Sequence, residues 1–126
     1  MNPMREVLLL LGEAGEILWS DASDSPVRLP DSRERWEAIW TRRDRLVEIA
    51  HSHPVGPRAF SSEDLSTMEA LDAALGRPLA YSVVAPDGVV RRAADGRVLA
   101  LGRDDTPWWA ALLALASGMS PTPKDP

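Results

Sequence analysis

Two histidines lie two positions apart in the chain, at His51 and His53, and Pro54 follows them at once. On a β-strand, side chains alternate between the two faces, so residues i and i+2 project from the same side. Two neutral imidazoles held in this way can bind one divalent ion. The chain has no cysteine, so imidazole and carboxylate groups are the expected ligands. Proline ends the strand and places the pair at its tip, where a cleft can form.

Asp64 is the candidate for a third ligand. We expect it in the first turn of a helix capped by Ser61 or Ser62, where the helix dipole favours the ionised carboxylate. Two histidines and one carboxylate leave a coordination position open for water, which is the pattern of catalytic zinc sites. Ser61 and Asp64 also fit a plain capping box. Both roles can coexist, because a hydroxyl at a helix N-terminus faces its electropositive end.

The segments around these residues predict how they are positioned. Leu46 to His51 alternates like a strand, and a loop rich in proline and glycine follows from Pro54 to Phe60. The next helix ends at Gly76, a residue favoured after a helix C-terminus. Its apolar side chains recur at helical spacing, and we expect them to form one buried stripe: Leu65, Met68, Leu71 and Leu75.

The rest of the chain predicts an α+β domain with a mixed or antiparallel sheet and packed helices. Three hairpin patterns supply strands, and a helix capped by Asp31, with Glu34 as a capping-box partner, should bury one apolar face. A last apolar helix should open at Asp105 or Thr106, with Pro107 at its first helical position. We expect the first helix to bury Trp36, Ile39 and Trp40, and the last helix to run to about Ala116. The expected strands of the hairpins are Val7 to Leu11, Ile17 to Trp19, Leu79 to Val84, Val89 to Ala93 and Val98 to Leu101.

Length and composition limit the class of protein. With 126 residues and a formal net charge of −5, the chain fits one domain and is not expected to bind nucleic acid. The apolar segments are too short for a signal peptide or a membrane span, so a soluble, cytoplasmic protein without membrane contact is expected. We predict a folded domain over residues 1–118 and a flexible, proline-rich tail over residues 119–126.

The motif as a whole resembles the signature of one enzyme family. His51-Ser-His53-Pro54, with seven residues between His53 and Ser61, and then Ser61-x-x-Asp64 is similar to the signature of the JAMM metallopeptidases, the MPN-plus domain. The resemblance implies an MPN-type, cytidine-deaminase-like fold over most of the chain. It also implies one Zn²⁺ per chain held by His51, His53 and Asp64, with a water as fourth ligand. By position, Ser61 would stabilise the tetrahedral oxyanion.

In this family a glutamate from the first strand acts as the general base, and Glu6 is our assignment. Members usually have a helix before this glutamate, and their Glu-to-Gly distance is one residue longer than that from Glu6 to Gly12. A slip of one residue reverses the face of a strand, so either Gly12 is displaced or Glu6 is not the base. Four other glutamates are less favoured as the base. Glu13 and Glu16 are expected in a turn, Glu37 is expected to be an exposed partner of Arg33, and Glu48 should point away from His51.

Two functions follow from the resemblance. The first is a zinc-dependent peptidase or isopeptidase acting at the C-terminal tail of a ubiquitin-like or sulfur-carrier protein, with the loop from Val55 to Phe60 beside the substrate groove. The second is a non-catalytic, metal-retaining MPN-type module that binds a partner protein. The intact ligand set favours the enzyme. The apolar last helix should either cover the sheet or pair two subunits, so the chain is expected to be a monomer or a homodimer.

Overall fold

The computed structural model describes residues 4–102 and 105–119, which form one six-stranded sheet in the order β2-β1-β3-β4-β5-β6. Strands β3 and β4 run parallel, and the other neighbouring strands are antiparallel. The mixed α+β fold predicted from the sequence is therefore confirmed. In chain order the elements are β1 (Val7–Gly12), β2 (Ile17–Ala22), α1 (Arg33–Thr41), β3 (Leu46–Ser52), α2 (Ser62–Leu75), β4 (Ala80–Ala85), β5 (Gly88–Arg92), β6 (Val98–Leu101) and α3 (Trp108–Ala116).

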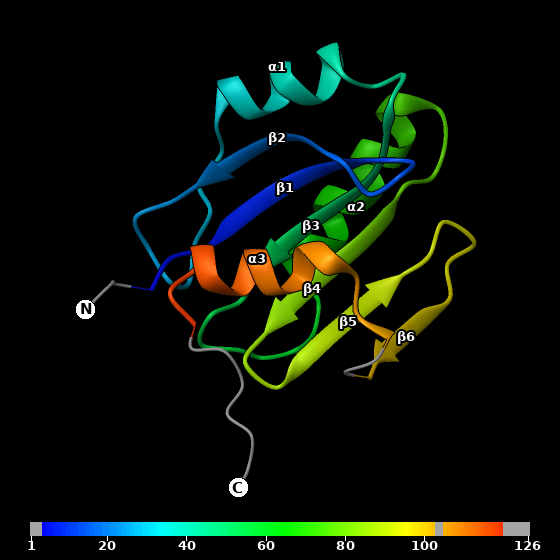
Figure 1. The fold of residues 1–126 in the computed structure, drawn as a ribbon. Coiled ribbons are helices and arrows are strands. Elements are labelled where there is room, and N and C mark those ends of the chain that lie inside the picture. The colour runs from blue at the N-terminus through cyan, green and yellow to red at the C-terminus, as the bar shows by residue number, and fades with distance from the viewer. Residues whose placement is uncertain (1–3, 103–104, 120–126) are drawn as a thin grey trace, which may run out of the picture.

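Helices cover both faces of the sheet, with α3 in front and α2 behind it in Figure 1. Trp109 and Leu113 of α3 pack on one face, and Ile39 of α1 and Met68 of α2 pack on the other. This arrangement explains the continuous apolar run in β1, because a strand buried on both faces needs apolar side chains throughout. Its alternate residues divide between the two cores: Val7, Leu9 and Leu11 face α3, whereas Leu8 and Leu10 face α1 and α2.

Helix α1 differs from its prediction in its cap and in its buried face. Ser32, not Asp31, is the N-cap, and its side chain accepts a hydrogen bond from the Arg35 backbone N–H. Trp36 and Trp40, which were expected in the core, are 36% and 56% exposed. Ile39 is buried as predicted, and the helix turns Arg35 and Ala38 inward beside it.

Arg35 is buried because its charge is paired. Its Nε atom lies 3.1 Å from Asp21 Oδ2, and Nη2 donates to the Pro30 carbonyl at 2.7 Å. Buried charges are tolerated in proteins when they are paired and hydrogen-bonded in this way.

Two other helix predictions also need correction. Leu65 of α2 is 47% exposed rather than part of a buried stripe, although Met68 is buried and Leu71 and Leu75 are partly buried. Pro107 is the N-cap of α3, not its first helical residue.

Helix α3 covers the sheet within the chain, which is one of the two arrangements expected for it. Its outer face leaves Trp108, Leu112 and Leu115 exposed. Met119, assigned to the tail from the sequence, is buried in the core beneath α3. The rest of the predicted tail, residues 120–126, lies outside the described residues. Among those described, no helix has the length and apolar character needed to cross a membrane.

The packing of α3 predicts that replacing two leucines of that helix by alanine will have very different effects on the stability of the fold. Leu113 is fully buried against the sheet, whereas Leu115 is 57% exposed. Leu113→Ala should lower the free energy of unfolding by about 2–5 kcal/mol, because it leaves a cavity under the helix. Leu115→Ala, the matched control, should change it by less than about 0.5 kcal/mol. Urea unfolding measures both, and equal effects would contradict this packing.

Candidate metal centre

Strand β3 and the residue after it carry the two histidines. Leu8 of β1 is directly opposite His51, so the His51 side chain shares the face of Leu8. His53 lies just beyond the end of β3, where its backbone N–H donates to the Val84 carbonyl of β4 at 2.8 Å and extends the strand pairing. Pro54 follows and is fully buried. The predicted strand with both imidazoles on one side is therefore confirmed.

The N-terminus of α2 holds Asp64 in place. Ser61, the first of the two predicted caps, is the N-cap, and its Oγ accepts the Asp64 backbone N–H at 3.0 Å. In return, Asp64 Oδ2 accepts the Ser61 backbone N–H at 2.8 Å. This capping box satisfies backbone donors at the helix end. It also fixes the carboxylate that faces the histidines.

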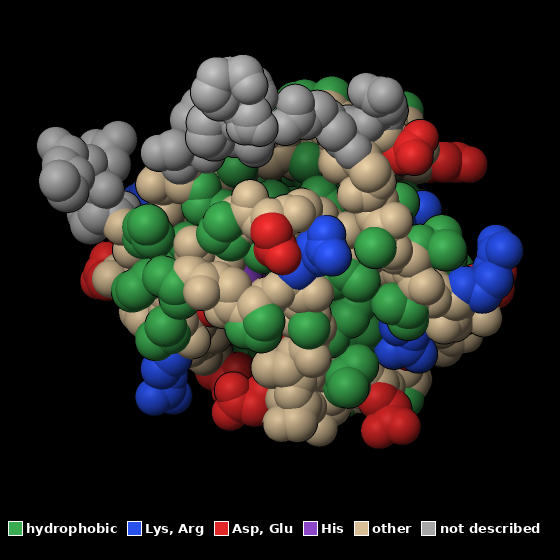
Figure 2. Space-filling view, turned by 90° about the horizontal axis from the view of Figure 1, so that it is seen from below, with side chains coloured by type: hydrophobic (Ala, Val, Ile, Leu, Met, Phe, Trp, Pro, Cys, Tyr) green, Lys and Arg blue, Asp and Glu red, His purple; other side chains and the backbone are tan. Residues whose placement is uncertain are grey.

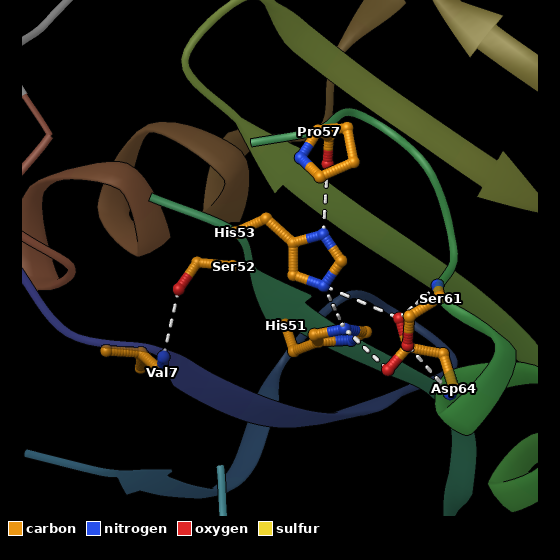
Figure 3. Close-up of polar contacts among 7 residues, drawn as sticks. All are labelled: Val7, His51, Ser52, His53, Pro57, Ser61 and Asp64. Carbon is orange, nitrogen blue, oxygen red and sulfur yellow. Dashed lines mark hydrogen bonds and ion pairs between the residues drawn. The ribbon is translucent and has the colours of Figure 1, made fainter. Parts of the chain in front are cut away.

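The three side chains converge on one point, as Figure 3 shows. The two Nε2 atoms lie 3.1 Å apart. Asp64 Oδ1 lies 3.4 Å from His51 Nε2, and Oδ2 lies 3.4 Å from His53 Nε2. The potential ligand atoms are all within 4.8 Å of one another, so His51, His53 and Asp64 can hold one metal ion.

A hydrogen bond to the backbone orients the ring of His53. Its Nδ1 lies 3.0 Å from the Pro57 carbonyl oxygen, which can only accept, so Nδ1 carries the proton and donates. In the neutral ring, Nε2 then keeps a lone pair that is available to a metal ion at the point where the three side chains converge. Hydrogen bonds of this kind fix the tautomer of metal-binding histidines in other proteins.

The local electrostatics favour a cation at this point. Burial opposes ionisation of Asp64, but hydrogen bonds from both histidines and from Ser61 outweigh it and hold the pKa of this carboxyl far below its usual range. Burial likewise opposes charge on His53, yet hydrogen bonds to Asp64 and Pro57 raise the pKa of this ring. The carboxylate therefore stays ionised at neutral pH.

Glu6 lies at the same site. Its side chain is 7% exposed and lines one cleft with both histidines, Ser61 and Asp64. The register explains why: Glu6 precedes Leu8 by two residues and so shares its face with His51. The pairing of β1 shifts between Leu10 and Gly12, at the other end of the strand. The short distance from Glu6 to Gly12 therefore displaces Gly12 and leaves Glu6 on the face of the histidines.

The alternative carboxylates lie elsewhere, as expected. Glu48 is on the face covered by α3, where it accepts a hydrogen bond from the Ser82 hydroxyl at 2.6 Å. Glu37 pairs with Arg33 on the exposed side of α1. Glu13 and Glu16 belong to the turn after β1, and Glu16 accepts the Ala14 backbone N–H there. None of these four lines the cleft that holds Glu6.

The cleft has a volume of about 680 Å³ and extends from the candidate ligands to the space between α1 and α2. Gly56 and Pro57 border it, in the loop predicted to lie beside a substrate groove. The side chains of His51 and His53 are 14% and 10% exposed, and little of the purple that marks histidine is visible from the side shown in Figure 2. Sequence reasoning missed another part of its wall, the stretch 27–31 before α1. No motif marks that stretch, and it is tied to α1 by the hydrogen bond from Arg35 to the Pro30 carbonyl.

The ligand set predicts different effects for two neighbouring acidic residues of α2. Asp64→Asn keeps an oxygen that can accept the Ser61 N–H but removes the ligand charge, so affinity for a divalent ion should fall at least ~100-fold, because even residues that only support ligands affect it 10–100-fold. Glu63→Gln removes one charge from the same helix turn and should leave the affinity nearly unchanged. Titration with Zn²⁺ as the probe ion measures both, and comparable losses would count against this ligand set.

Sequence comparison agrees with this geometry. A family model described as prokaryotic homologs of the JAB domain matches residues 6–100. The match begins at Glu6 and includes His51, His53, Ser61 and Asp64. No curated protein matches the sequence significantly. Because the model covers most of the chain, the protein belongs to the family of prokaryotic JAB-domain homologs.

Proposed function

We propose that this protein is a zinc-dependent metallopeptidase or isopeptidase. The observation that carries the proposal is the position of Glu6: a buried carboxylate that shares a cleft with the candidate ligands His51, His53 and Asp64. A structural metal site needs no such group. A hydrolytic site needs a group beside the ion that accepts a proton from water.

The donor set and its spacing favour zinc. Imidazole nitrogen and carboxylate oxygen are common zinc ligands, and three protein ligands leave one position of a tetrahedron open. With ligand distances of about 2.0–2.1 Å, neighbouring ligands of a tetrahedral zinc ion are separated by about 3.3 Å. The separations here are 3.1 Å between the two nitrogens, 3.4 Å from His51 Nε2 to Asp64 Oδ1 and 3.4 Å from His53 Nε2 to Asp64 Oδ2. The two nitrogens are thus spaced as ligands of one zinc ion would be, and the carboxylate lies within reach of both.

When bound, zinc would lower the pKa of a coordinated water towards neutrality and polarise the scissile carbonyl. The Glu6 carboxylate would accept the proton of the attacking water and deliver it to the leaving amine. Its environment suits both steps, because burial raises the pKa of Glu6 while His51 and His53 lower it and Asp64 raises it. A carboxyl whose pKa lies nearer to neutral pH can both take up and release a proton.

Ser61 would stabilise the oxyanion of the tetrahedral intermediate. Its Oγ accepts the Asp64 backbone N–H, which leaves its own O–H free to donate. The side chain is exposed at the lining of the cleft. The capping role and the catalytic role therefore use different parts of one hydroxyl, and the hydrogen bond in the cap orients the donor for the other role.

The substrate we propose is the extended C-terminal tail of a ubiquitin-like or sulfur-carrier protein. The lining of the cleft supports this proposal: it runs from the candidate ligands to residues of α1 and α2, and Leu8, Ile39 and Ile49 make part of it apolar. Extended peptides are a form of substrate that proteins bind along partly apolar surfaces.

Glu6→Gln should separate catalysis from metal binding. The amide keeps the shape of the side chain but cannot accept the proton of water, so kcat should fall about 10²–10⁴-fold while zinc stays near one per chain. The control Glu13→Gln, in the exposed turn after β1, should keep full activity. The assay is cleavage of a ubiquitin-like fusion, with chelator and His53→Ala as metal-free references. Full activity in Glu6→Gln would refute the assigned base, and activity that survives metal removal would refute the mechanism.

Ser61→Ala should lower activity by more than the loss of a helix cap can explain. Two serines cap helices in this structure, Ser61 on α2 and Ser32 on α1. Replacing either by alanine should cost a similar stability, about 1 kcal/mol. Ser61→Ala should also lower kcat about 10–10³-fold through loss of the oxyanion donor, whereas Ser32→Ala should not. Equal kcat values for these variants would remove Ser61 from the catalytic step.

A further inference from the structure

The backbone on each side of Glu6 is tied to three different parts of the molecule. The Arg5 N–H donates to the Ser117 carbonyl at 3.0 Å, and the Glu6 N–H donates to the Ser25 carbonyl at 2.8 Å. The Val7 N–H donates to the hydroxyl of Ser52 at 2.9 Å, as Figure 3 shows. Three consecutive N–H groups are thus held by α3, by the loop after β2 and by a side chain of β3.

The Ser52 hydroxyl belongs to a buried chain of hydrogen bonds. Its Oγ lies 2.6 Å from Ser117 Oγ, which lies 2.7 Å from the Leu113 carbonyl oxygen. That carbonyl can only accept, so the Ser117 proton is directed to it. Ser52 then donates its own proton to Ser117 and accepts from Val7. Every donor in the chain is satisfied when the order is Val7 N–H, Ser52 O–H, Ser117 O–H and Leu113 C=O.

Because of the position of Ser52, this series of hydrogen bonds links the two parts of the site. Ser52 lies between His51 and His53, and its side chain points to the opposite face of the sheet, towards α3. Both Ser52 and Ser117 have no exposed surface. The same residue therefore connects the strand that carries both imidazoles to the backbone that carries Glu6, and Ser117 connects both to the C-terminal end of α3.

We propose that Ser52 and Ser117 are positioning residues that hold Glu6 at the correct distance from the candidate metal ligands. The proposal rests on the function proposed above, in which Glu6 is the base. A misplacement of about 1 Å can cost on the order of 10²-fold in rate, so the support beneath a base affects catalysis even where it touches no substrate. Ser117 is the C-cap of α3 and lies outside the residues matched by the family model. The proposal therefore gives α3, which the family match does not cover, a role in the site.

The first test measures how strongly the Val7 backbone amide is protected from hydrogen exchange, and it needs neither metal nor substrate. Ser52→Ala removes the acceptor of the Val7 N–H, so hydrogen exchange at the Val7 amide in the metal-free protein should accelerate at least ~10-fold. Ser117→Ala should accelerate it less, and Ser52→Thr, which keeps a hydroxyl, should restore it. The matched control is Ser82→Ala: Ser82 is also without exposed surface and donates to Glu48, away from the cleft. Exchange at Val7 that is unchanged in Ser52→Ala and Ser117→Ala would overturn the proposal.

The second test asks whether the effect passes through Glu6. In the zinc-loaded protein, Ser117→Ala should lower kcat about 10-fold or more while KM and zinc content stay unchanged, and Ser82→Ala should leave kcat unchanged. Combined with Glu6→Gln, Ser117→Ala should cause no further loss, because the group that it positions is already disabled. A purely structural role predicts an additive loss or a loss of zinc, and either result would contradict positioning.

The two tests keep this inference separate from the proposed function. A wild-type protein that binds zinc but cleaves no peptide would refute the proposed function, and hydrogen exchange would still show whether Ser52 and Ser117 hold the backbone at Glu6. An active wild type whose kcat is unaffected by Ser117→Ala, despite faster exchange at Val7, would refute only the positioning role.

Discussion

The antiparallel register between β1 and β3 is the constraint on which the site depends. Leu8 lies opposite His51, and because side chains alternate, this single pairing places Glu6 and both imidazoles on one face. A slip of one residue would turn every side chain of β1 to the other face. Glu6 would then point towards α3, and the leucines of β1 that now pack in one core would point into the other. Hydrophobic burial on both faces of β1 therefore enforces the register that the candidate chemistry requires.

The N-terminus of α2 also combines folding and site geometry. The hydrogen bonds that begin α2 also orient Asp64, and the hydroxyl of Ser61 caps the helix while its proton remains available to a substrate. The His53 ring is fixed by the carbonyl of Pro57 in the loop between β3 and α2. Hydrogen bonds within the chain thus orient two of the three candidate ligands, Asp64 and His53.

Local patterns predicted the strands, α2 and the approach of the three candidate ligands, because each depends on near neighbours: alternation in β3, a capping box at Ser61, and a glycine after Leu75. Predictions failed where distant residues decide the outcome. Trp36 and Trp40 form an apolar face by spacing, but the pairing of Arg35 with Asp21 turns a different face inward. Ser52 and Ser117 are far apart in the sequence, and no periodicity marks their contact. The short distance from Glu6 to Gly12 left the face of Glu6 open, and only the register of the folded sheet places its side chain on the face of the histidines.

X-ray absorption spectroscopy of the zinc-loaded protein tests the central claim, a zinc ion with three protein ligands and one open position, most directly. The account predicts a four-coordinate ion with two imidazole nitrogens and two oxygens, one from Asp64 and one from water, at about 2.0–2.1 Å. A six-coordinate shell of oxygens without imidazole scattering would contradict it.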